Sequence, residues 1–327
     1  MNHERRARLL AQLADGGFHS GEALAATAGI SRTAVWKQIQ TLRQRGLDIF
    51  SVQGKGYRLA RPYECLDAGS IQSALPQRQY APIKVFFELA STNQYLLEQA
   101  VQHGEVCLAE YQSAGRGRHG HGWQSPLGAG LYLSIAWRAD GLPEPVTGLS
   151  LAAGLAVLRA LKSCDVPCNG RHGGVGLKWP NDLLCDGRKL GGILLQVRGE
   201  VTGPCLLVLG VGINLRLPVQ ANTKIDQPVT DLAQIIADLP SRNHLAAVLI
   251  HELSQCLERY PQQGFAGLRS DWHEHDVLRG RQVTLHLGER RIEGEMLGVD
   301  ADGALLLGQQ DQIQRFASGE LSVRISP

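Results

Sequence analysis

The sequence predicts an α+β protein in three parts: a small helical head, an α/β body and a short all-β tail. Three observations lead to this division. Apolar residues in the first 62 positions recur with a helical period, strand-like and helix-like runs alternate in the middle of the chain, and five short strand-like runs follow residue 276. At 327 residues the chain is also about two average domains long.

Composition excludes several classes of protein. Hydrophobic residues make up 43% of the chain, and its 38 Gly and 14 Pro follow no triplet period, which excludes a disordered or collagen-like chain. No apolar run is long enough to cross a membrane, and the chain begins with charged residues, unlike a secretory signal. Seven scattered cysteines predict no disulfide framework, so we expect a cytoplasmic protein.

The head carries an excess of positive charge. Through residue 62, ten Lys/Arg stand against four Asp/Glu, whereas the rest of the chain has a net charge of −4. Apolar periodicity predicts a helix over residues 5–14, a short helix capped by Ser20 and ended by Gly29, and a third helix from Ser31 to about Arg45. An anionic partner is therefore expected for the head alone.

Two strands, over residues 48–53 and 56–60, follow the third helix and flank Gly54-Lys55. Three helices and a hairpin in this order are typical of a winged helix-turn-helix, expected over residues 1–62; a helical bundle with a solvated basic face is the competing interpretation. The apolar positions of the third helix that must face the other two are Val35, Ile39 and Leu42. The residues expected to contact DNA are Arg32, Thr33, Trp36, Lys37 and, at the wing tip, Lys55.

The body, residues 67–272, follows a linker expected at residues 64–69. Helices are expected from about Gln94 and over residues 148–161, and Asp186-Gly187 predicts a hairpin turn. Ser91-Thr92-Asn93 caps the first of these helices or offers two hydroxyls and an amide to a buried ligand; the residues alone favour the cap. The expected strands are residues 83–89, 106–110, 131–137, 183–185, 190–197 and 205–213.

Glycines alternate with cationic side chains in a loop that we name the Gly/Arg loop, residues 112–123. Glycine lets the backbone approach a ligand closely, and arginine offers paired donors to a phosphate or carboxylate. No Gly-Lys-Ser/Thr follows, so the loop is not a P-loop. A flexible basic surface loop is the alternative, which the regular spacing and the terminal Trp123 argue against.

A second motif, Lys178-Trp179-Pro180-Asn181-Asp182, follows an apolar run, so we expect Lys178 to be partly buried and to need an anion. Residues 167–176 before it look like an insertion. Four residues that could bind a metal lie in or beside this stretch, namely Cys164, Cys168, His172 and Cys185. A zinc site is the alternative there, but glycines and loose spacing favour ordinary loop residues, so no metal site is expected.

The tail alternates apolar residues with polar or Gly-rich turns, which predicts a small β-barrel over residues 276–327. Its expected strands are residues 283–287, 291–299, 304–307, 312–316 and 321–325. We assign no role to His273 and His275 near its start.

Four motifs occur in order behind the winged head: Ser91-Thr92-Asn93, Gly115-Arg116-Gly117-Arg118, Lys178-Trp179-Pro180-Asn181-Asp182 and Gly210-Val211-Gly212-Ile213-Asn214. With them, essentially the whole chain resembles the bifunctional biotin–protein ligases that also repress the biotin operon. The resemblance implies a class II synthetase-like ligase core and an SH3-like fold for the barrel.

The resemblance also implies an activity. The chain would join biotin to ATP, with Mg²⁺, as biotinyl-5′-AMP and pass the biotin to a lysine of the biotin carboxyl carrier protein of acetyl-CoA carboxylase. With biotinyl-AMP bound it would form a homodimer on biotin operator DNA, with no part in a membrane. The implied catalytic residues are Lys178, Arg116 and Arg118. Biotin would contact Ser91, Thr92, Asn93, Gln112, Arg116, Gly117, Arg118 and Lys178, and the adenylate Arg118, Trp123, Asn181 and Asn214.

Some positions depart from the family pattern. His119 and His121 stand where arginines are expected, so the charge of the loop depends on pH near neutrality. Residues 215–228 match the family's adenylate-covering loop only weakly. Arg324 stands where the family's tail approaches the nucleotide, although a structural role in a strand is favoured.

Three alternatives stay open. A ligase for another acid, such as lipoate or octanoate, is disfavoured by the winged head and the intact Gly/Arg loop. A sensor with a decayed ligase core is disfavoured because Lys178, Arg116 and Arg118 are all present. An active ligase whose head does not bind DNA is kept open by Trp36, which is bulky for a base-contacting position.

Overall fold

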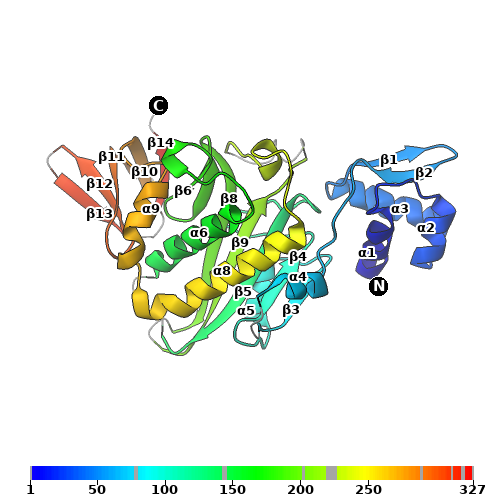
Figure 1. Ribbon diagram of the computed structural model, residues 1–327, viewed down its shortest axis with the longest axis horizontal. Coiled ribbons are helices and arrows are strands. Elements are labelled where there is room, and N and C mark those ends of the chain that lie inside the picture. The colour runs from blue at the N-terminus through cyan, green and yellow to red at the C-terminus, as the bar shows by residue number, and fades with distance from the viewer. Residues whose placement is uncertain are drawn as a thin grey trace.

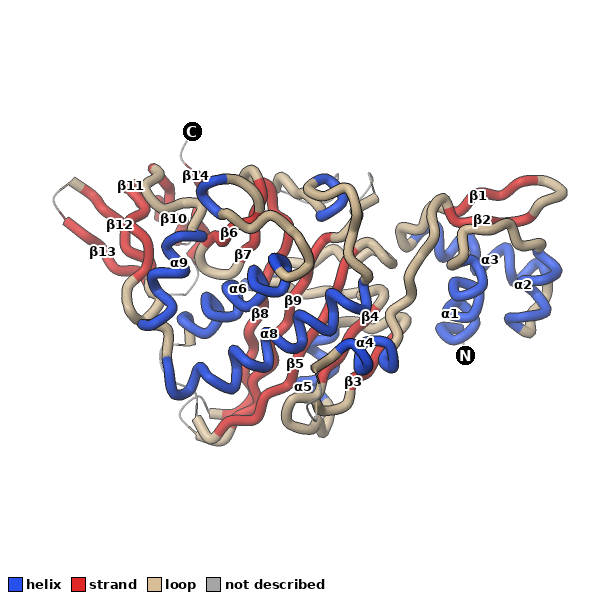
Figure 2. The backbone as a smooth tube through the Cα atoms, in the orientation of Figure 1, coloured by secondary structure: helices blue, strands red, loops and turns tan. Residues whose placement is uncertain are grey.

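The computed structural model describes residues 2–76, 80–141, 146–200, 203–218, 227–287, 290–310, 312–317 and 321–325. The head lies at one end of the long axis, a sheet covered by helices lies in the middle, and a small β domain lies at the other end (Figures 1 and 2). The predicted fold class, α+β in three parts, is therefore confirmed. No helix of the described residues is long and apolar enough to cross a membrane.

The head has the predicted helices and wing. Its elements are α1 Asn2–Leu13, α2 Gly21–Ala28, α3 Arg32–Gln44, β1 Ile49–Val52 and β2 Gly56–Leu59. Ser20 and Ser31 cap α2 and α3, each hydroxyl accepting a backbone N–H three residues on, and Gly29 ends α2 in the left-handed region. The residues predicted to face the other helices are fully buried: Val35, Ile39 and Leu42.

The body is built on one mixed sheet in the strand order β3-β4-β5-β9-β8-β7-β6, in which only the β3–β4 pair is parallel. Asp186 and Gly187, both at positive φ, form the predicted turn between β7 and β8. The strands are β3 Ile83–Phe86, β4 Val106–Ala109, β5 Gly130–Ala139, β6 Val175–Lys178, β7 Asp182–Cys185, β8 Arg188–Gly199 and β9 Cys205–Asn214.

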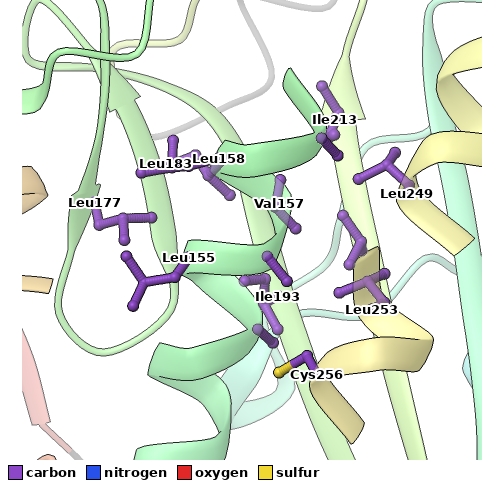
Figure 3. Packing of buried hydrophobic residues seen from close by; sticks show 14 of the residues in the cluster. Leu155, Val157, Leu158, Leu177, Leu183, Ile193, Ile213, Leu249, Leu253 and Cys256 are labelled. Atoms are coloured by element: carbon purple, nitrogen blue, oxygen red, sulfur yellow. The ribbon is translucent and has the colours of Figure 1, made fainter. Parts of the chain in front are cut away.

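Helices cover both faces of this sheet. α6 (Thr147–Lys162) and α8 (Arg242–Gln263) pack on one face, where their leucines meet those of the strands (Figure 3). α5 (Thr92–Glu98) lies on the other. Strand alternation explains the division, because Val106 and Leu108 of β4 join the first cluster whereas Cys107 joins Leu96 of α5.

The C-terminal domain is a five-stranded antiparallel sheet in the order β13-β12-β11-β10-β14. Its strands are β10 Gln282–Leu287, β11 Arg290–Val299, β12 Leu305–Gln309, β13 Gln312–Phe316 and β14 Leu321–Ile325. All five predicted strands are present, and their bounds differ by at most two residues. The short helix α9, Arg269–His275, leads into the domain.

Two expectations about the start of the body need correction. The linker expected to reach residue 69 ends earlier, because the carboxylate of Asp67 accepts the N–H of Ser70 and begins helix α4, Ala68–Ala74. The strand expected to reach residue 89 ends at Phe86, where the chain bends and presents Glu88 to the head. Helices α4, α8 and α9 were not predicted.

Candidate functional site

The Gly/Arg loop is a folded element above the sheet. Arg116 and Gly122 form an antiparallel bridge, Gly117 donates its N–H to the carbonyl of His121 at 2.7 Å, and Trp123 donates to Gly115 at 2.8 Å. The short 3-10 turn Arg118–Gly120 closes the tip, with His119 at φ 53°. The loop therefore forms a narrow hairpin that presents arginines on one side.

Two adjoining cavities lie between this loop and β8. The larger, of about 520 Å³, is lined by Arg116, Gly117, Arg118, His119, Gly120, Leu194, Leu195 and Gln196. The smaller, of about 170 Å³, is lined by Arg118, Val146, Thr147, Ser150, Pro180, Ile193 and Leu195. Arg118 and Leu195 line both, so the two cavities adjoin at these residues. Burial lowers the pKa of Arg118, and the nearby carboxylate of Asp182 acts in the opposite direction.

A buried polar network lies beneath the larger cavity. The Ser134 hydroxyl donates to the side-chain oxygen of Asn93 at 2.6 Å and lies 2.7 Å from the hydroxyl of Thr92. The side-chain oxygen of Gln112 accepts the N–H of Thr92 at 2.8 Å. The Asn93 amide donates to the carbonyl of Leu194 and to the side chain of Gln196, both of which line the cavity. Ser91 does act as the N-cap of α5. The predicted cap and ligand roles are thus compatible, because the Ser91 hydroxyl caps the helix whereas the side chains of Thr92 and Asn93 belong to the network beneath the cavity.

Two glycines of β9 leave the space for this arrangement. Gly210 and Gly212 are two residues apart and so lie on one face of the strand. A Cβ atom on Gly210 would overlap the side-chain oxygen of Asn93, and one on Gly212 would lie 2.7 Å from the ring of Trp123. The indole of Trp123 therefore rests on the backbone of β9, and Lys189 Nζ lies 5.5 Å from its ring centre.

Lys178 ends β6 and is half buried, as predicted. It pairs in register with Asp182, which holds Lys189 in an ion pair of 2.7 Å. Lys178 does not line either cavity itself, but Pro180 in the connecting loop lines the smaller one. The loop and Lys178 thus lie at the same end of the sheet as Arg118.

Two predicted adenylate contacts have structural roles. Asn181 donates to the carbonyl of Ile193 at 2.7 Å, and the buried Asn214 donates to the carbonyl of Thr230 at 3.0 Å. Residues that the sequence interpretation left out are Ser134, Lys189 and Gln196. Ser134 had a detectable signal, because it is a single hydroxyl inside an otherwise apolar strand.

The expected DNA-contacting residues share one exposed surface. Arg32, Thr33, Trp36 and Lys37 are all exposed on α3, and Trp36 is 52% exposed. Lys55 is exposed at the wing tip. Phe18 lies beneath it, with Lys55 Nζ 5.7 Å and the Arg58 guanidinium 4.8 Å from its ring centre. The head therefore presents cations beside exposed aromatic rings.

Several expectations lie outside what the structure describes. Residues 219–226 of the stretch expected to cover the adenylate, and the side chain of Arg324, are among them. Within the described ranges, no three His, Cys, Asp or Glu side chains are placed to hold a metal ion. All seven cysteines are free thiols.

Comparison with known proteins accounts for all three parts of the chain. The HTH domain family matches residues 5–58, the Biotin/lipoate A/B protein ligase family residues 86–214, and the Biotin protein ligase C terminal domain family residues 279–324. The bifunctional ligase/repressor BirA of Escherichia coli is 42% identical over 97% of this chain and 96% of its own.

The chain belongs to the bifunctional biotin ligase/repressor family. Another relative, the biotin–[acetyl-CoA-carboxylase] ligase of Mycobacterium tuberculosis, is 37% identical over 69% of this chain and 82% of its own. The biotin protein ligase of Aquifex aeolicus in complex with biotin and ATP superposes with a TM-score of 0.64 at 28% identity, over 75% of this chain and 99% of that one. The ligase/repressor family thus combines, as here, a ligase core with a helix-turn-helix head.

Proposed function

We propose that this chain activates biotin with ATP, transfers the biotinyl group to a carrier-protein lysine, and represses transcription through its head. The observation that carries the proposal is the position of Arg118, which is shared by the larger and the smaller cavity. A carboxylate in one cavity and a nucleotide phosphate in the other would both face this guanidinium.

The first step brings two anions together, so its barrier is largely electrostatic. A carboxylate oxygen of biotin attacks the α-phosphorus of ATP, and the bond to the β-phosphate breaks to release pyrophosphate. Arg116 and Arg118 on the loop and Lys178 on β6 would offset the accumulating negative charge. Each must stay protonated to do so, and an arginine does at any physiological pH.

Ligand positions follow from the linings. The bicyclic ring of biotin would occupy the larger cavity above Ser91, Thr92, Asn93 and Gln112, with Gly117 allowing close backbone approach. The adenylate would lie toward Trp123, whose indole N–H is buried without a hydrogen-bond partner among the described residues. Asn181 and Asn214 would support the adenylate site indirectly, because their side chains hydrogen-bond the backbone carbonyls of Ile193 and Thr230.

In the second step, the amine of a carrier lysine attacks the biotinyl carbonyl carbon and AMP leaves. No residue of this chain becomes acylated, because the nucleophile comes from the carrier. The Gly/Arg loop would shield the mixed anhydride from water until the carrier arrives. The acetyl-CoA carboxylase named for the mycobacterial relative supports its carrier protein as the acceptor.

Mg²⁺ would serve as the counter-ion of the nucleotide. Magnesium is usually held by one or two carboxylates together with substrate phosphates. Asp182 is the carboxylate beside Arg118, and it is engaged by Lys189. The phosphates themselves would therefore supply most of the ligands, with Asp182 as the side chain nearest to the ion.

For repression, two heads would bind two half-sites of an operator after a biotinyl-AMP-bound homodimer forms. The exposed cations on α3 and at the wing tip support DNA as the partner. We propose the domain bounds 1–62, 67–272 and 276–327, and a cytoplasmic location, which the seven free thiols support.

Pyrophosphate release tests the ligase half. We expect release from Mg-ATP with biotin but not with lipoate or octanoate, and its loss in Lys178→Ala. Lys162→Ala, an exposed lysine at the far end of α6, is the matched control and is expected to keep wild-type rates. Release with lipoate alone would reassign the substrate, and no release with any acid would leave the core as a sensor.

A gel shift on the biotin operator, with and without biotinyl-AMP, tests the repressor half. Lys37→Ala is expected to weaken binding and to reduce the salt dependence of the affinity by about one phosphate contact. Arg8→Ala, an exposed cation on α1, is the control. Equal affinity of the wild type for operator and unrelated DNA would contradict repression.

A further inference from the structure

The loop that follows Lys178 is held on three sides. Ser150 of α6 donates to the carbonyl of Pro180 at 3.3 Å. Asn181 exchanges main-chain and side-chain hydrogen bonds with Ile193 of β8. The indole of Trp179 donates to the carbonyl of Gly303 at 3.0 Å. The third support is unusual because Gly303 belongs to the C-terminal domain, 124 residues further along the chain.

Gly303 lies in a rigid turn between β11 and β12. The carboxylate of Asp300 accepts the N–H groups of Asp302 and Ala304, both at 2.9 Å. Arg315 of β13 pairs with both Asp300 and Asp302 from outside the turn. The carbonyl that receives Trp179 is therefore fixed by the C-terminal domain rather than by the ligase core.

The same turn also touches the first turn of α6. A Cβ atom on Gly303, which has φ +82°, would lie 2.9 Å from the Cα of Gly148. A Cβ on Gly148 would in turn lie 3.2 Å from the carbonyl oxygen of Asp302. Backbone meets backbone here, so the contact leaves little room for adjustment.

Both contacts are made by elements that line the smaller cavity. Thr147 and Ser150 of α6 line this cavity, and so does Pro180, the neighbour of Trp179. The turn at residues 300–303 thus contacts both the start of α6 and the loop that follows Lys178. Trp179 itself is fully buried, lines neither cavity and donates its indole N–H to the C-terminal domain.

We infer that the turn at residues 300–303 of the C-terminal domain is a positioning element of the adenylation site. Trp179 and Gly303 act as positioning residues that hold Lys178 relative to Arg118. This inference rests on the proposed function, because it assumes that Lys178 acts on the biotin carboxylate and the α-phosphate. Displacement of a charged group from a reacting centre lowers the rate of the chemical step more than it weakens substrate binding.

Trp179→Phe in the full chain tests the inference. It removes the indole N–H donor together with part of the ring system, so the control must lose the same ring volume at another buried tryptophan. We expect kcat for biotin-dependent pyrophosphate release to fall at least tenfold while KM for biotin changes less than twofold. The matched control is Trp272→Phe. Trp272 is also buried, but its indole N–H has no hydrogen-bond partner among the described residues, so the same deletion breaks no bond. Its kcat should stay within twofold of wild type.

Arg315→Ala gives a second measurement from the protein surface. It loosens the turn without entering the core, and we expect kcat to fall at least threefold at unchanged KM for biotin. This variant decides the question if Trp179→Phe does not fold. Equal kcat in wild type and Trp179→Phe, or equal losses in Trp179→Phe and Trp272→Phe, would overturn the inference. Failure of the proposed function is distinguishable, since the wild type itself would then release no pyrophosphate.

Discussion

Arg45, the residue that caps the C-terminal end of α3, is ion-paired with Glu88, three residues before the site residue Ser91. The same carboxylate accepts Arg6 at 2.9 Å. From the other side, Leu127 donates its N–H to the carbonyl of Arg45 at 2.8 Å. The C-terminal end of α3 therefore contacts the core at residues before and after the Gly/Arg loop.

Glu88→Gln is expected to loosen the head. The change removes the charge that two arginines share in a largely buried position, where a charged hydrogen bond contributes about 1–3 kcal/mol to stability. Urea unfolding should show a loss of that size. Glu98→Gln, an exposed glutamate on α5, is the control and should cost less than about 0.5 kcal/mol. Equal stabilities of the two variants would show that Glu88 does not hold the head.

Arg242→Leu is expected to destabilise the chain strongly. Arg242 is buried, and its guanidinium lies 2.8 Å from the buried carboxylate of Glu110. Removal of one partner leaves a buried charge without compensation, at a cost of about 3–5 kcal/mol. Chemical denaturation measures the loss. The double variant Arg242→Leu/Glu110→Leu should be more stable than Arg242→Leu alone, and the opposite order would refute this explanation.

His273 is expected to make stability fall in acid. Burial first, and then the charge of Arg279, lower the pKa of His273, whose Nε2 lies 3.0 Å from the N–H of Val299. The folded chain then binds this proton more weakly than the unfolded chain. Stability is thus retained at neutral pH and lost as pH falls below the ordinary histidine value of about 6.5. His273→Gln should flatten the dependence of unfolding free energy on pH between about 5 and 7.

His275, two residues along α9, should act with the opposite sign. The hydrogen bond to Asp271 raises the pKa of His275, so the folded chain binds this proton more tightly. Its contribution is complete below the ordinary value of about 6.5 and is lost as pH rises through the higher folded value. His275→Gln should therefore remove a decline in stability above neutrality. The same pH effect in both variants would contradict the opposite assignments.

Gly210→Ala is expected to impair biotin binding. Its methyl group would overlap the side-chain oxygen of Asn93 and so disturb the network beneath the larger cavity. Overpacking of this kind costs about 1–3 kcal/mol, so we expect the affinity measured by titration calorimetry to fall by about 5- to 150-fold. Gly267→Ala is the control, because nothing lies within 4 Å of its added Cβ and its φ is unstrained. Wild-type affinity in Gly210→Ala would mean that Asn93 does not shape the site.

Local signals predicted much of the fold. The caps Ser20 and Ser31, the turn at Asp186-Gly187 and the alternation in the tail each involve residues a few positions apart, and each is present in the structure. The helical spacing of α8 is present in its leucines, but Pro261 inside the helix obscures its end. The type of each element is thus encoded more clearly than its bounds.

The candidate site was predictable only in part. The resemblance supplied the Gly/Arg loop and the lysine motif, and the structure brings Arg118 and the loop after Lys178 to adjoining cavities. The supporting contacts join residues far apart in the chain, such as Ser134 with Asn93 and Trp179 with Gly303. No spacing in a single sequence encodes such pairs, since only the packed sheet brings them together.

The segment that connects the head to the body, residues 63–66, also forms part of the core. Its contacts decide where the chain should be cut to make a variant without the head. Glu110 accepts the hydroxyl of Tyr63 at 2.5 Å and the N–H of Leu66 at 2.6 Å, beside Arg242. A truncation after residue 66 would strip the buried Glu110 of two of its donors and damage the ligase together with the head. A cut just before Tyr63 would keep both donors, and the core would then lose the ion pairs that Arg6 and Arg45 make with Glu88.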